Sequence, residues 1–344
     1  MGRPGGEARR AERYDGPMQF GLSLLGLAQQ PVGEDMRERL AEILRWVHEA
    51  RETDFDYLML GQHYLSSPFQ AFQPVPLLAR LVPESGDMRL VSTLVGPLHN
   101  PVDLAETWAT LDVLSGGRVG LSIGLGYRDV EYRAFGVDRA TRVRRMRDTV
   151  ETLRDLWTGE PVTRSGDGFL LDRAVCTLAP LQRPHPPIWI AASADAAIQR
   201  AAGWGLDWNI NAQATVPEVA RQAAVYAAAA RSPEPPRFAM SRELFCAATT
   251  EEAIRVAGPY LANKYEVRKA WRSGAEAPAQ PGTVEAESPF ILGDPDECAR
   301  QIERYREVGV DRMHLRMNWP GMPLEASLRG LRLFATEVLP RFRA

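Results

Sequence analysis

Cysteine is scarce in this sequence, and the spacing of the few that are present excludes two kinds of site. The 344 residues include three cysteines, Cys176, Cys246 and Cys298, with no CxxC pair among them. An odd number of widely separated cysteines does not make a disulfide framework and does not have zinc-ligand spacing. We therefore expect buried free thiols in a reducing cytoplasm. No histidine pair has HxH or HExxH spacing either, so we expect no metal site.

Long apolar runs and an excess of charge are also lacking. No stretch approaches the roughly 20 apolar residues of a membrane-spanning helix, so no membrane partner is expected. The net charge is −3, and the arginine-rich stretch 139–147 has no interleaved aromatic residues. We interpret that stretch as a solvated helix face and expect no nucleic-acid partner. Residues 1–17 lack the apolar segment of a secretory signal and are interpreted as a disordered tail.

What the sequence does have is an alternation of apolar strand-like runs and amphipathic helical segments. Near-continuous apolar strands are typical of parallel sheets that are buried on both faces. Eight strand-then-helix units predict an α/β protein with a (β/α)8 TIM barrel, as a single domain over 18–344. A doubly wound open sheet is the alternative, but it usually has fewer units. The predicted strands are 18–24, 57–60, 89–95, 118–124, 187–192, 206–210, 237–248 and 311–317.

Two segments interrupt this alternation and are predicted to be insertions. Residues 161–186 predict a short hairpin after the fourth strand. Residues 272–289 are rich in Ala, Pro, Gly and Glu, which cannot bury much surface, and they predict a mobile loop or lid before the eighth strand. Before the first of these insertions, the segment 118–157 is interpreted as one strand followed by a long helical stretch.

The active site of such a barrel lies at the carboxyl ends of its strands, so residues that directly follow the strands are the candidates. Most of them carry uncharged polar groups or are glycines, which suits a flat, hydrogen-bonding, largely apolar ligand. They include Gln62, His63 and Tyr64 after the second strand, Gly96 after the third, Gly124, Gly126 and Tyr127 after the fourth, Ala192 and Ser193 after the fifth, Asn209 and Asn211 after the sixth, and Arg316 and Asn318 after the eighth.

Each of these candidates also has a structural interpretation. His63 either catalyses or satisfies a local hydrogen bond. The GxG at Gly124 and Gly126 is not a dinucleotide fingerprint, because Asp129 replaces the third glycine; it is either a tight turn or a place where a planar ring approaches the backbone. Ser193 is expected at the N-cap of a helix, and the same helix start could bind phosphate.

The segments FDYLMLGQHY, LDVLSGGRVGLSIGLGYRDVEYRAFG and PPIWIAASADAAIQRAAGWGLD resemble the luciferase-like flavin-dependent monooxygenases, the superfamily of bacterial luciferase. With the closing segment GDPDECARQIERYREVGVDRMHLRM, the resemblance covers about residues 18–340. It implies a barrel that holds reduced FMN across its strand ends, O2 as co-substrate, and a separate flavin reductase. It also implies a homodimer formed through the helices beside strands two and three.

The resemblance also implies roles for individual residues. Relatives often have Gly-Glu-His-His where this chain has GQHY, so His63 matches the catalytic histidine over the flavin. Gln62 replaces an acid and Tyr64 a second histidine, and we assign both to the catalytic group. Gly96, Gly124, Gly126 and Tyr127 match flavin contacts. Ser193 matches a phosphate-binding serine, with Ala192 beside it where relatives often have an acidic residue.

The leading hypothesis is a flavin-dependent monooxygenase that uses reduced FMN and O2 to oxidise a small hydrophobic organic substrate. The alternatives are an oxidoreductase that transfers hydride with the deazaflavin coenzyme F-420, and a non-catalytic flavin-binding protein. Five apolar residues near the strand ends, together with the polar Asn209, are the predicted substrate contacts, with ordinary barrel packing as the alternative role of the apolar ones. These residues are Leu65, Phe69, Phe72, Asn209, Met317 and Trp319.

Overall fold

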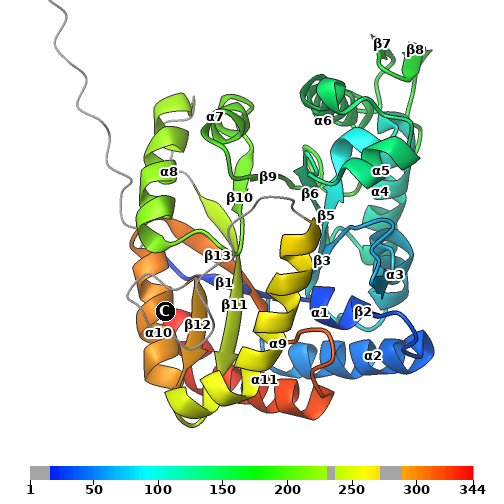
Figure 1. Cartoon of the computed structure of the whole chain (residues 1–344). Helices are drawn as coiled ribbons and strands as arrows, with labels where there is room; N and C mark the ends of the chain where they lie inside the picture. Colours follow the sequence, from blue (N-terminus) through cyan, green and yellow to red (C-terminus); the bar gives the residue numbers. More distant parts are fainter. Residues whose placement is uncertain (1–15, 231–236, 272–288, 344) are drawn as a thin grey trace, which may run out of the picture.

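Eight parallel strands close into a barrel in the computed structural model of the chain, which describes residues 16–230, 237–271 and 289–343. The strands pair in the order β10, β9, β6, β5, β3, β1, β13 and β11, and the pairing of β10 with β11 closes the ring (Figure 1). The predicted (β/α)8 barrel is therefore confirmed. Its strands are β1 (Gln19–Ser23), β3 (Tyr57–Gly61), β5 (Arg89–Val95), β6 (Val119–Gly124), β9 (Ile188–Ala192), β10 (Asp207–Ile210), β11 (Phe238–Cys246) and β13 (Val310–Arg316).

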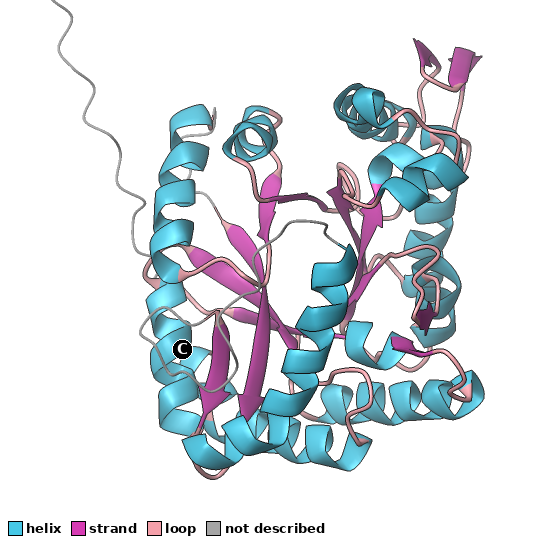
Figure 2. Ribbon diagram, viewed as in Figure 1, coloured by secondary structure: helices cyan, strands magenta, loops and turns pink. Residues whose placement is uncertain are grey.

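Helices surround the strands, as Figure 2 shows, and every barrel strand is followed along the chain by a helix. This arrangement explains why the strands are apolar on both faces: one face meets the helices and the other meets the barrel interior. The main helices are α2 (Met36–Glu52), α3 (Pro74–Leu81), α4 (Pro101–Ser115), α6 (Arg142–Leu156), α7 (Asp195–Gly203), α8 (Val216–Ala229), α9 (Thr250–Trp271), α10 (Pro295–Arg306) and α11 (Leu324–Glu337).

The start and the end of helix α4 are determined by local sequence signals. The Asn100 side chain accepts a hydrogen bond from the Val102 amide at 2.9 Å and caps the start of the helix. Pro101 follows at the first helical position, where a backbone N–H is not needed. The helix ends at Gly116, whose φ of 66° is the left-handed conformation that glycine adopts without strain. These signals determine where the helix begins and ends.

The barrel interior is filled by large side chains below the open end. Tyr57, Met59, Val91, Trp189 and Ala239 form one buried cluster, in which the Tyr57 and Trp189 rings meet edge to face with centroids 5.9 Å apart. A much larger apolar cluster lies between the strands and the surrounding helices. The interior is thus a packed core that supports a cavity at the open end, as in other barrels of this class.

The predicted hairpin after the fourth strand is present as β7 (Val162–Gly166) and β8 (Phe169–Ala174), which pair antiparallel. Three short strands were not predicted: β2 (Gln29–Pro31), its antiparallel partner β4 (Phe69–Ala71), and β12 (Phe290–Gly293), which extends the sheet at the far end of β11. Runs of three or four residues are too short to show a strand period.

Two predicted segments lie mostly outside the described residues, namely the tail over 1–17 and the loop over 272–289. The three cysteines are buried and free, as expected. Within the described ranges, no helix has both the length and the apolar content needed to cross a membrane.

Candidate active site

A cavity of about 510 Å³ opens at the carboxyl ends of the barrel strands. Seven strands contribute to its lining through their last residues or the segments that follow, which is the place where the sequence predicted a site, and β11 contributes Ser241 from its middle. Its volume falls in the usual range of about 300–1,000 Å³ for small-molecule and cofactor sites. From the strands and the segments that follow, the lining includes Ser23, Met59, Gly61, Gln62, His63, Thr93, Leu94, Val95, Gly124, Leu125, Gly126, Tyr127, Ala191, Ala192, Ser193, Asn209, Ile210, Asn211, Ser241, His314 and Arg316.

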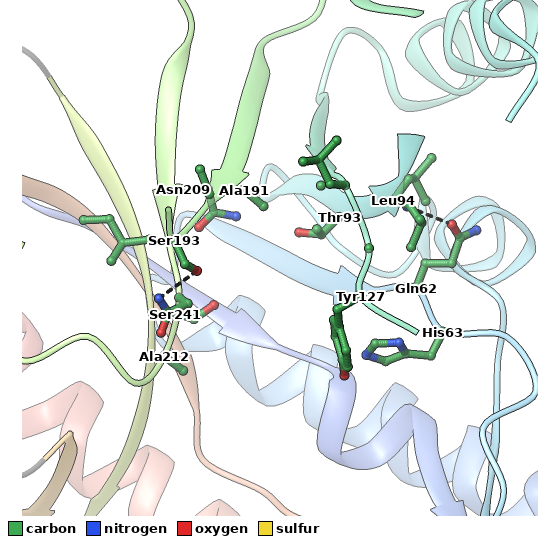
Figure 3. Close-up of a pocket in the computed structure, with 18 of the residues that line it drawn as sticks. Gln62, His63, Thr93, Leu94, Tyr127, Ala191, Ser193, Asn209, Ala212 and Ser241 are labelled. Atoms are coloured by element: carbon green, nitrogen blue, oxygen red, sulfur yellow. Dashed lines mark hydrogen bonds between the residues drawn. The ribbon is translucent and has the colours of Figure 1, made fainter. Parts of the chain in front are cut away.

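His63 lies in the cavity wall with Glu131 behind it. The Nδ1 atom of His63 is 3.5 Å from Oε1 of Glu131, a carboxylate that is 1% exposed. The imidazole also meets the Tyr127 ring edge to face, with centroids 5.9 Å apart, and Figure 3 shows the two side chains next to each other. Because Nδ1 is turned toward the carboxylate, Nε2 is the nitrogen placed to act on a ligand.

Glu131 is held in place from two sides and remains ionised. Its Oε1 accepts hydrogen bonds from the Tyr64 amide at 3.0 Å and from Arg128 Nη1 at 3.2 Å. Burial opposes the charge, but the contacts with His63 and the Tyr64 amide outweigh it and lower the pKa of the Glu131 carboxyl. Glu131 belongs to helix α5 (Asp129–Ala134), so the loop after β6 supplies the partner of the histidine that follows β3.

Both the Nε2 and the Oε1 atoms of Gln62 form hydrogen bonds within the protein. Its Nε2 donates to the Tyr64 hydroxyl at 2.8 Å, and its Oε1 accepts from the Val95 amide at 3.2 Å. The same oxygen lies 2.9 Å from Nε2 of His99, and burial lowers the pKa of His99, so this imidazole is neutral near pH 7. Gln62 therefore fixes the ends of strands β3 and β5 relative to each other.

Tyr64 lies behind the cavity and does not line it. Its hydroxyl accepts from Gln62, and its ring packs against Phe135 with centroids 4.6 Å apart. Burial, followed by the charge of Glu131, raises the pKa of its phenol. The structure thus separates the three predicted catalytic residues: His63 faces the cavity, Gln62 borders it, and Tyr64 supports both.

The glycines after β6 form a shelf in the cavity. At Gly126, φ is 73° and an added Cβ would lie 2.5 Å from Cγ1 of Val95, so only glycine fits. Gly124 also lines the cavity. Gly96 does not: an added Cβ there would lie 2.3 Å from Cγ2 of Ile123, which indicates a packing role beneath the shelf.

Ser193 lies at the opposite side of the cavity from His63, as Figure 3 shows, but it does not cap helix α7. The N-cap residue is Ala194, which has no side chain for capping, so the predicted N-cap role of Ser193 is wrong. The Ser193 hydroxyl accepts a hydrogen bond from Nδ2 of Asn211 at 3.0 Å. Ala192, Ser193 and Ala194 all line the cavity beside the start of this helix.

Two arginines of the 139–147 stretch also line the cavity. Arg139 lies in the short helix η2 (Arg139–Thr141), and Arg142 is the first residue of α6. Arg139 also donates to Asp129 at 2.6 Å. The stretch is solvated as expected at Arg139, Arg144 and Arg147, whose side chains are 44%, 58% and 53% exposed, but Arg139 and Arg142 border the cavity as well. The reason is that the helical stretch is broken after Ala134, and Gly136, with φ of 64°, turns the chain back toward the mouth.

The wall formed by β11 and β13 is polar. Nε2 of His314 lies 2.5 Å from the Ser241 hydroxyl, and its Nδ1 lies 3.4 Å from the Tyr57 hydroxyl. Burial, helped by the charges of Arg316 and Arg312, lowers the pKa of His314 to about 3, so this side chain is neutral. His314 is buried and lines the cavity.

Behind this wall, the fully buried carboxylate of Glu243 accepts hydrogen bonds from several side chains. Glu243 accepts from Lys264 Nζ at 2.5 Å, Arg316 Nη1 at 3.0 Å and Trp319 Nε1 at 2.6 Å. Burial opposes ionisation of Glu243, but the charges of Lys264 and Arg316 outweigh it and hold the pKa of the carboxyl well below its usual range.

Of the six residues predicted to contact substrate, Asn209 lines the cavity, where its Nδ2 donates to the Ser122 hydroxyl at 3.0 Å. The other five do not line it. Leu65 is 60% exposed, Phe69 lies in β4, and Phe72 packs against the main core. Met317 and Trp319 are fully buried behind the strands.

The residues present fit a flavin phosphate. The glycine shelf admits a flat ring close to the backbone, and the segments after the neighbouring strands β6 and β9 add cationic and hydroxyl donors to the lining, namely Arg139, Arg142 and Ser193. A metal site is a poorer fit, because the described part of the chain contains no group of three His, Cys, Asp or Glu side chains arranged to hold an ion.

Comparison with known proteins agrees with this geometry. Residues 18–312 match the model of the family described as luciferase-like monooxygenase. The oxygenase component of a flavin-dependent trigonelline monooxygenase from Acinetobacter baylyi is 26% identical over 82% of this chain and 84% of its own length. An FMNH2-dependent dimethylsulfone monooxygenase from Pseudomonas putida is 25% identical over 80% of this chain and 81% of its own length.

A relative with another cofactor matches at a similar level. A coenzyme F-420-dependent glucose-6-phosphate dehydrogenase from Amycolatopsis mediterranei is 25% identical over 88% of this chain and 95% of its own length. Among solved structures, monooxygenase RslO1 from Streptomyces bottropensis superposes with a TM-score of 0.81, at 26% identity, over 94% of this chain and all of its own.

Proposed function

Because the chain belongs to the luciferase-like monooxygenase family, we propose that it is a flavin-dependent monooxygenase that uses reduced FMN and O2 to oxidise a small organic substrate. The observation that carries the proposal is the position of His63, which lies in the lining of the strand-end cavity with Glu131 behind it and Tyr127 beside it. Bound reduced FMN would supply the electrons for the reduction of O2.

The phosphate of FMN would lie between Ser193, Arg139 and Arg142. All three line the cavity from segments that follow the paired strands β6 and β9, and arginine is well suited to a phosphate because its planar N–H fork matches the oxygens. The start of helix α7 adds backbone N–H groups and the positive end of the helix dipole. The ring system would lie on the glycine shelf at Gly124 and Gly126.

His63 would transfer a proton at Nε2, with Glu131 holding Nδ1. An ionised carboxylate at that distance favours the tautomer with hydrogen on Nδ1 and stabilises the imidazolium when it forms. Gln62 cannot ionise and would act by orienting the loop that carries His63. Apolar lining residues such as Leu25, Met59 and Leu94 would keep water away from the reacting atoms and contact the apolar part of the substrate.

Reduced FMN would come from a separate flavin reductase, since one relative is named as an oxygenase component. We also propose a cytoplasmic homodimer. The three free thiols favour a reducing compartment. Helix α4, which follows the third barrel strand, exposes 41% of Val113 and 57% of Leu114, the kind of apolar surface that a subunit contact would cover. Light scattering during size-exclusion chromatography measures the oligomeric state.

The second candidate is hydride transfer with coenzyme F-420, favoured by the dehydrogenase relative that covers 88% of this chain. Measurement of oxygen uptake distinguishes the monooxygenase from the coenzyme F-420-dependent dehydrogenase. The monooxygenase requires O2 in an amount equal to the oxidised substrate, whereas the dehydrogenase proceeds without O2 and reduces coenzyme F-420. A non-catalytic flavin carrier would bind FMN but give neither reaction, and the paired His63 and Glu131 argue against it.

A further inference from the structure

The cavity carries positive charge at two places that lie across the barrel from each other. Arg139 and Arg142 follow strand β6, whereas Arg316 is the last residue of β13. In the closed ring, three strands separate β6 from β13 on either side: β5, β3 and β1 in one direction, and β9, β10 and β11 in the other. Two strand ends separated in this way face each other across the mouth, so one phosphate group cannot serve both places.

Protein groups accept only some of the hydrogen bonds that the Arg316 guanidinium can donate. Its Nη1 donates to Glu243 at 3.0 Å, but the accepting oxygen also takes hydrogen bonds from Lys264 and Tyr265. Its Nη2 reaches the Ser241 hydroxyl at 3.5 Å, the longest of these contacts, and its Nε is buried with no hydrogen-bond partner among the described residues. Arg316 thus makes one short hydrogen bond out of its five N–H groups.

Arg316 shares the single carboxylate of Glu243 with Lys264, and its neighbours in the cavity add no negative charge to balance the remaining positive charge. His314 is uncharged, because its pKa is lowered to about 3, and Ser241 is a neutral hydroxyl. The acidic residue of the lining is Glu131, which follows β6 on the other side and is engaged with Arg128 and His63. A cation in a partly dry cavity is stabilised when a ligand brings the opposite charge.

We propose that this wall binds a carboxylate of the organic substrate through Arg316, with the Ser241 hydroxyl as a second donor. The inference rests on the proposed function in one respect, that the flavin phosphate occupies the Arg139 and Arg142 side. A carboxylate is the anion whose two oxygens match the planar guanidinium. The substrate is then an organic acid whose apolar body lies between the two charged ends of the cavity.

The test uses small carboxylates paired with their amides, namely benzoate with benzamide and 3-phenylpropionate with 3-phenylpropionamide. Affinity is measured by ligand-observed NMR on the FMN-saturated protein. At least one acid should bind the wild type about tenfold or more tightly than its amide. Arg316→Met should abolish that preference, while Arg329→Met, at an exposed arginine of α11, should retain it. The inference is overturned if acids and amides bind equally, or if the preference survives Arg316→Met.

Two further measurements keep the result interpretable. Arg316→Met removes one partner of a buried carboxylate and could weaken folding, so Arg316→Lys, which keeps a charge near Glu243 without the planar fork, should reduce the preference without abolishing it. FMN titration of Arg316→Met should give an affinity within about twofold of wild type. A large loss would assign Arg316 to the flavin and overturn the inference. Failure of the wild type to bind FMN, with acid preference intact, would contradict the proposed function alone.

Discussion

Nδ1 of His63 lies 3.5 Å from Oε1 of Glu131, a carboxylate that the fold buries almost completely. The two residues are far apart in the chain: His63 follows strand β3, whereas Glu131 lies in helix α5, which follows strand β6. A charged carboxylate behind an imidazole fixes which nitrogen faces the cavity, and this relation is the basis for assigning proton transfer to His63.

Replacement of His63 by alanine is expected to damage turnover far more than flavin binding. General acid–base catalysis typically raises a reaction rate by about 100- to 10,000-fold. The rate of single-turnover substrate oxidation should therefore fall by about that factor in the variant. FMN affinity should stay within a few-fold, since the phosphate donors lie elsewhere in the cavity. A variant that oxidises substrate at nearly the wild-type rate would exclude His63 as the catalyst.

Arg142→Met is expected to weaken FMN binding by about 10- to 100-fold, the usual value of one hydrogen bond to a charged group. Riboflavin, which has no phosphate, should bind both proteins equally. Arg147→Met is the matched control, because Arg147 lies on the same helix but is 53% exposed. Equal affinity of the wild type for FMN and riboflavin would remove the phosphate from this end of the cavity.

Gln62→Leu should destabilise the protein, whereas Gln62→Glu should fold. Leucine leaves the Val95 amide and the buried His99 without their acceptor, at a cost of about 1–3 kcal/mol for a buried group. Glutamate keeps that acceptor and adds an ionisable group near His63, so it should change the pH dependence of turnover more than the maximal rate. Urea unfolding and pH–rate profiles measure the two effects, and a fully stable Gln62→Leu would contradict the assigned hydrogen bonds.

The stability of the fold is expected to fall as the pH is lowered from 6.5 toward 3, with His314 as a main cause. Burial lowers the pKa of this histidine to about 3, whereas in the unfolded chain it titrates near 6.5. Within that window the unfolded state binds the proton and the native state does not, so acid favours unfolding by up to about 1.4 kcal/mol per pH unit.

His314→Gln should reduce this slope, measured by urea unfolding between pH 7 and pH 5. His99, whose pKa is also lowered by burial, acts in the same direction and remains in the variant. The lowered pKa of Glu243 contributes stability that is lost only below about pH 4.3, the usual value for glutamate, so it does not interfere in this range. An unchanged slope in His314→Gln would show that His314 is protonated in the native state.

The sequence predicted the barrel well, because strands buried on both faces and capped helices leave strong local signals. It also identified the strand-end residues Gln62, His63, Tyr127, Ser193 and Asn209, all of which line the cavity. These predictions succeeded because they relied on a rule about where strands end, which does not depend on how side chains pack.

The errors at β13 arose from the alternation of side chains along a strand. His314 and Arg316 are two positions apart and point into the barrel. Met317 directly follows Arg316, so its side chain points to the opposite face of the strand and is buried in the main apolar core. Its apolar character therefore reflects packing and not substrate contact. The strand-end rule correctly placed Arg316 at the mouth, and the period of two would have added His314 to the lining in place of Met317.

Other site residues depended on long-range geometry that no local pattern shows. The chain turns away from the cavity at Leu65, where φ is 49°, and carries Phe69 into the ribbon with β2. The pairing of Glu131 with His63 joins residues 68 positions apart, and the return of Arg139 and Arg142 to the mouth requires the break between α5 and α6.

The most direct test of the central claim is anaerobic dialysis of the protein against equal concentrations of reduced FMN and reduced coenzyme F-420, followed by admission of O2. The account predicts that the protein retains reduced FMN at one per chain, that Arg142→Met loses it, and that oxygen uptake follows when O2 is admitted. Retention of coenzyme F-420 in preference to FMN, with no oxygen uptake, would contradict it.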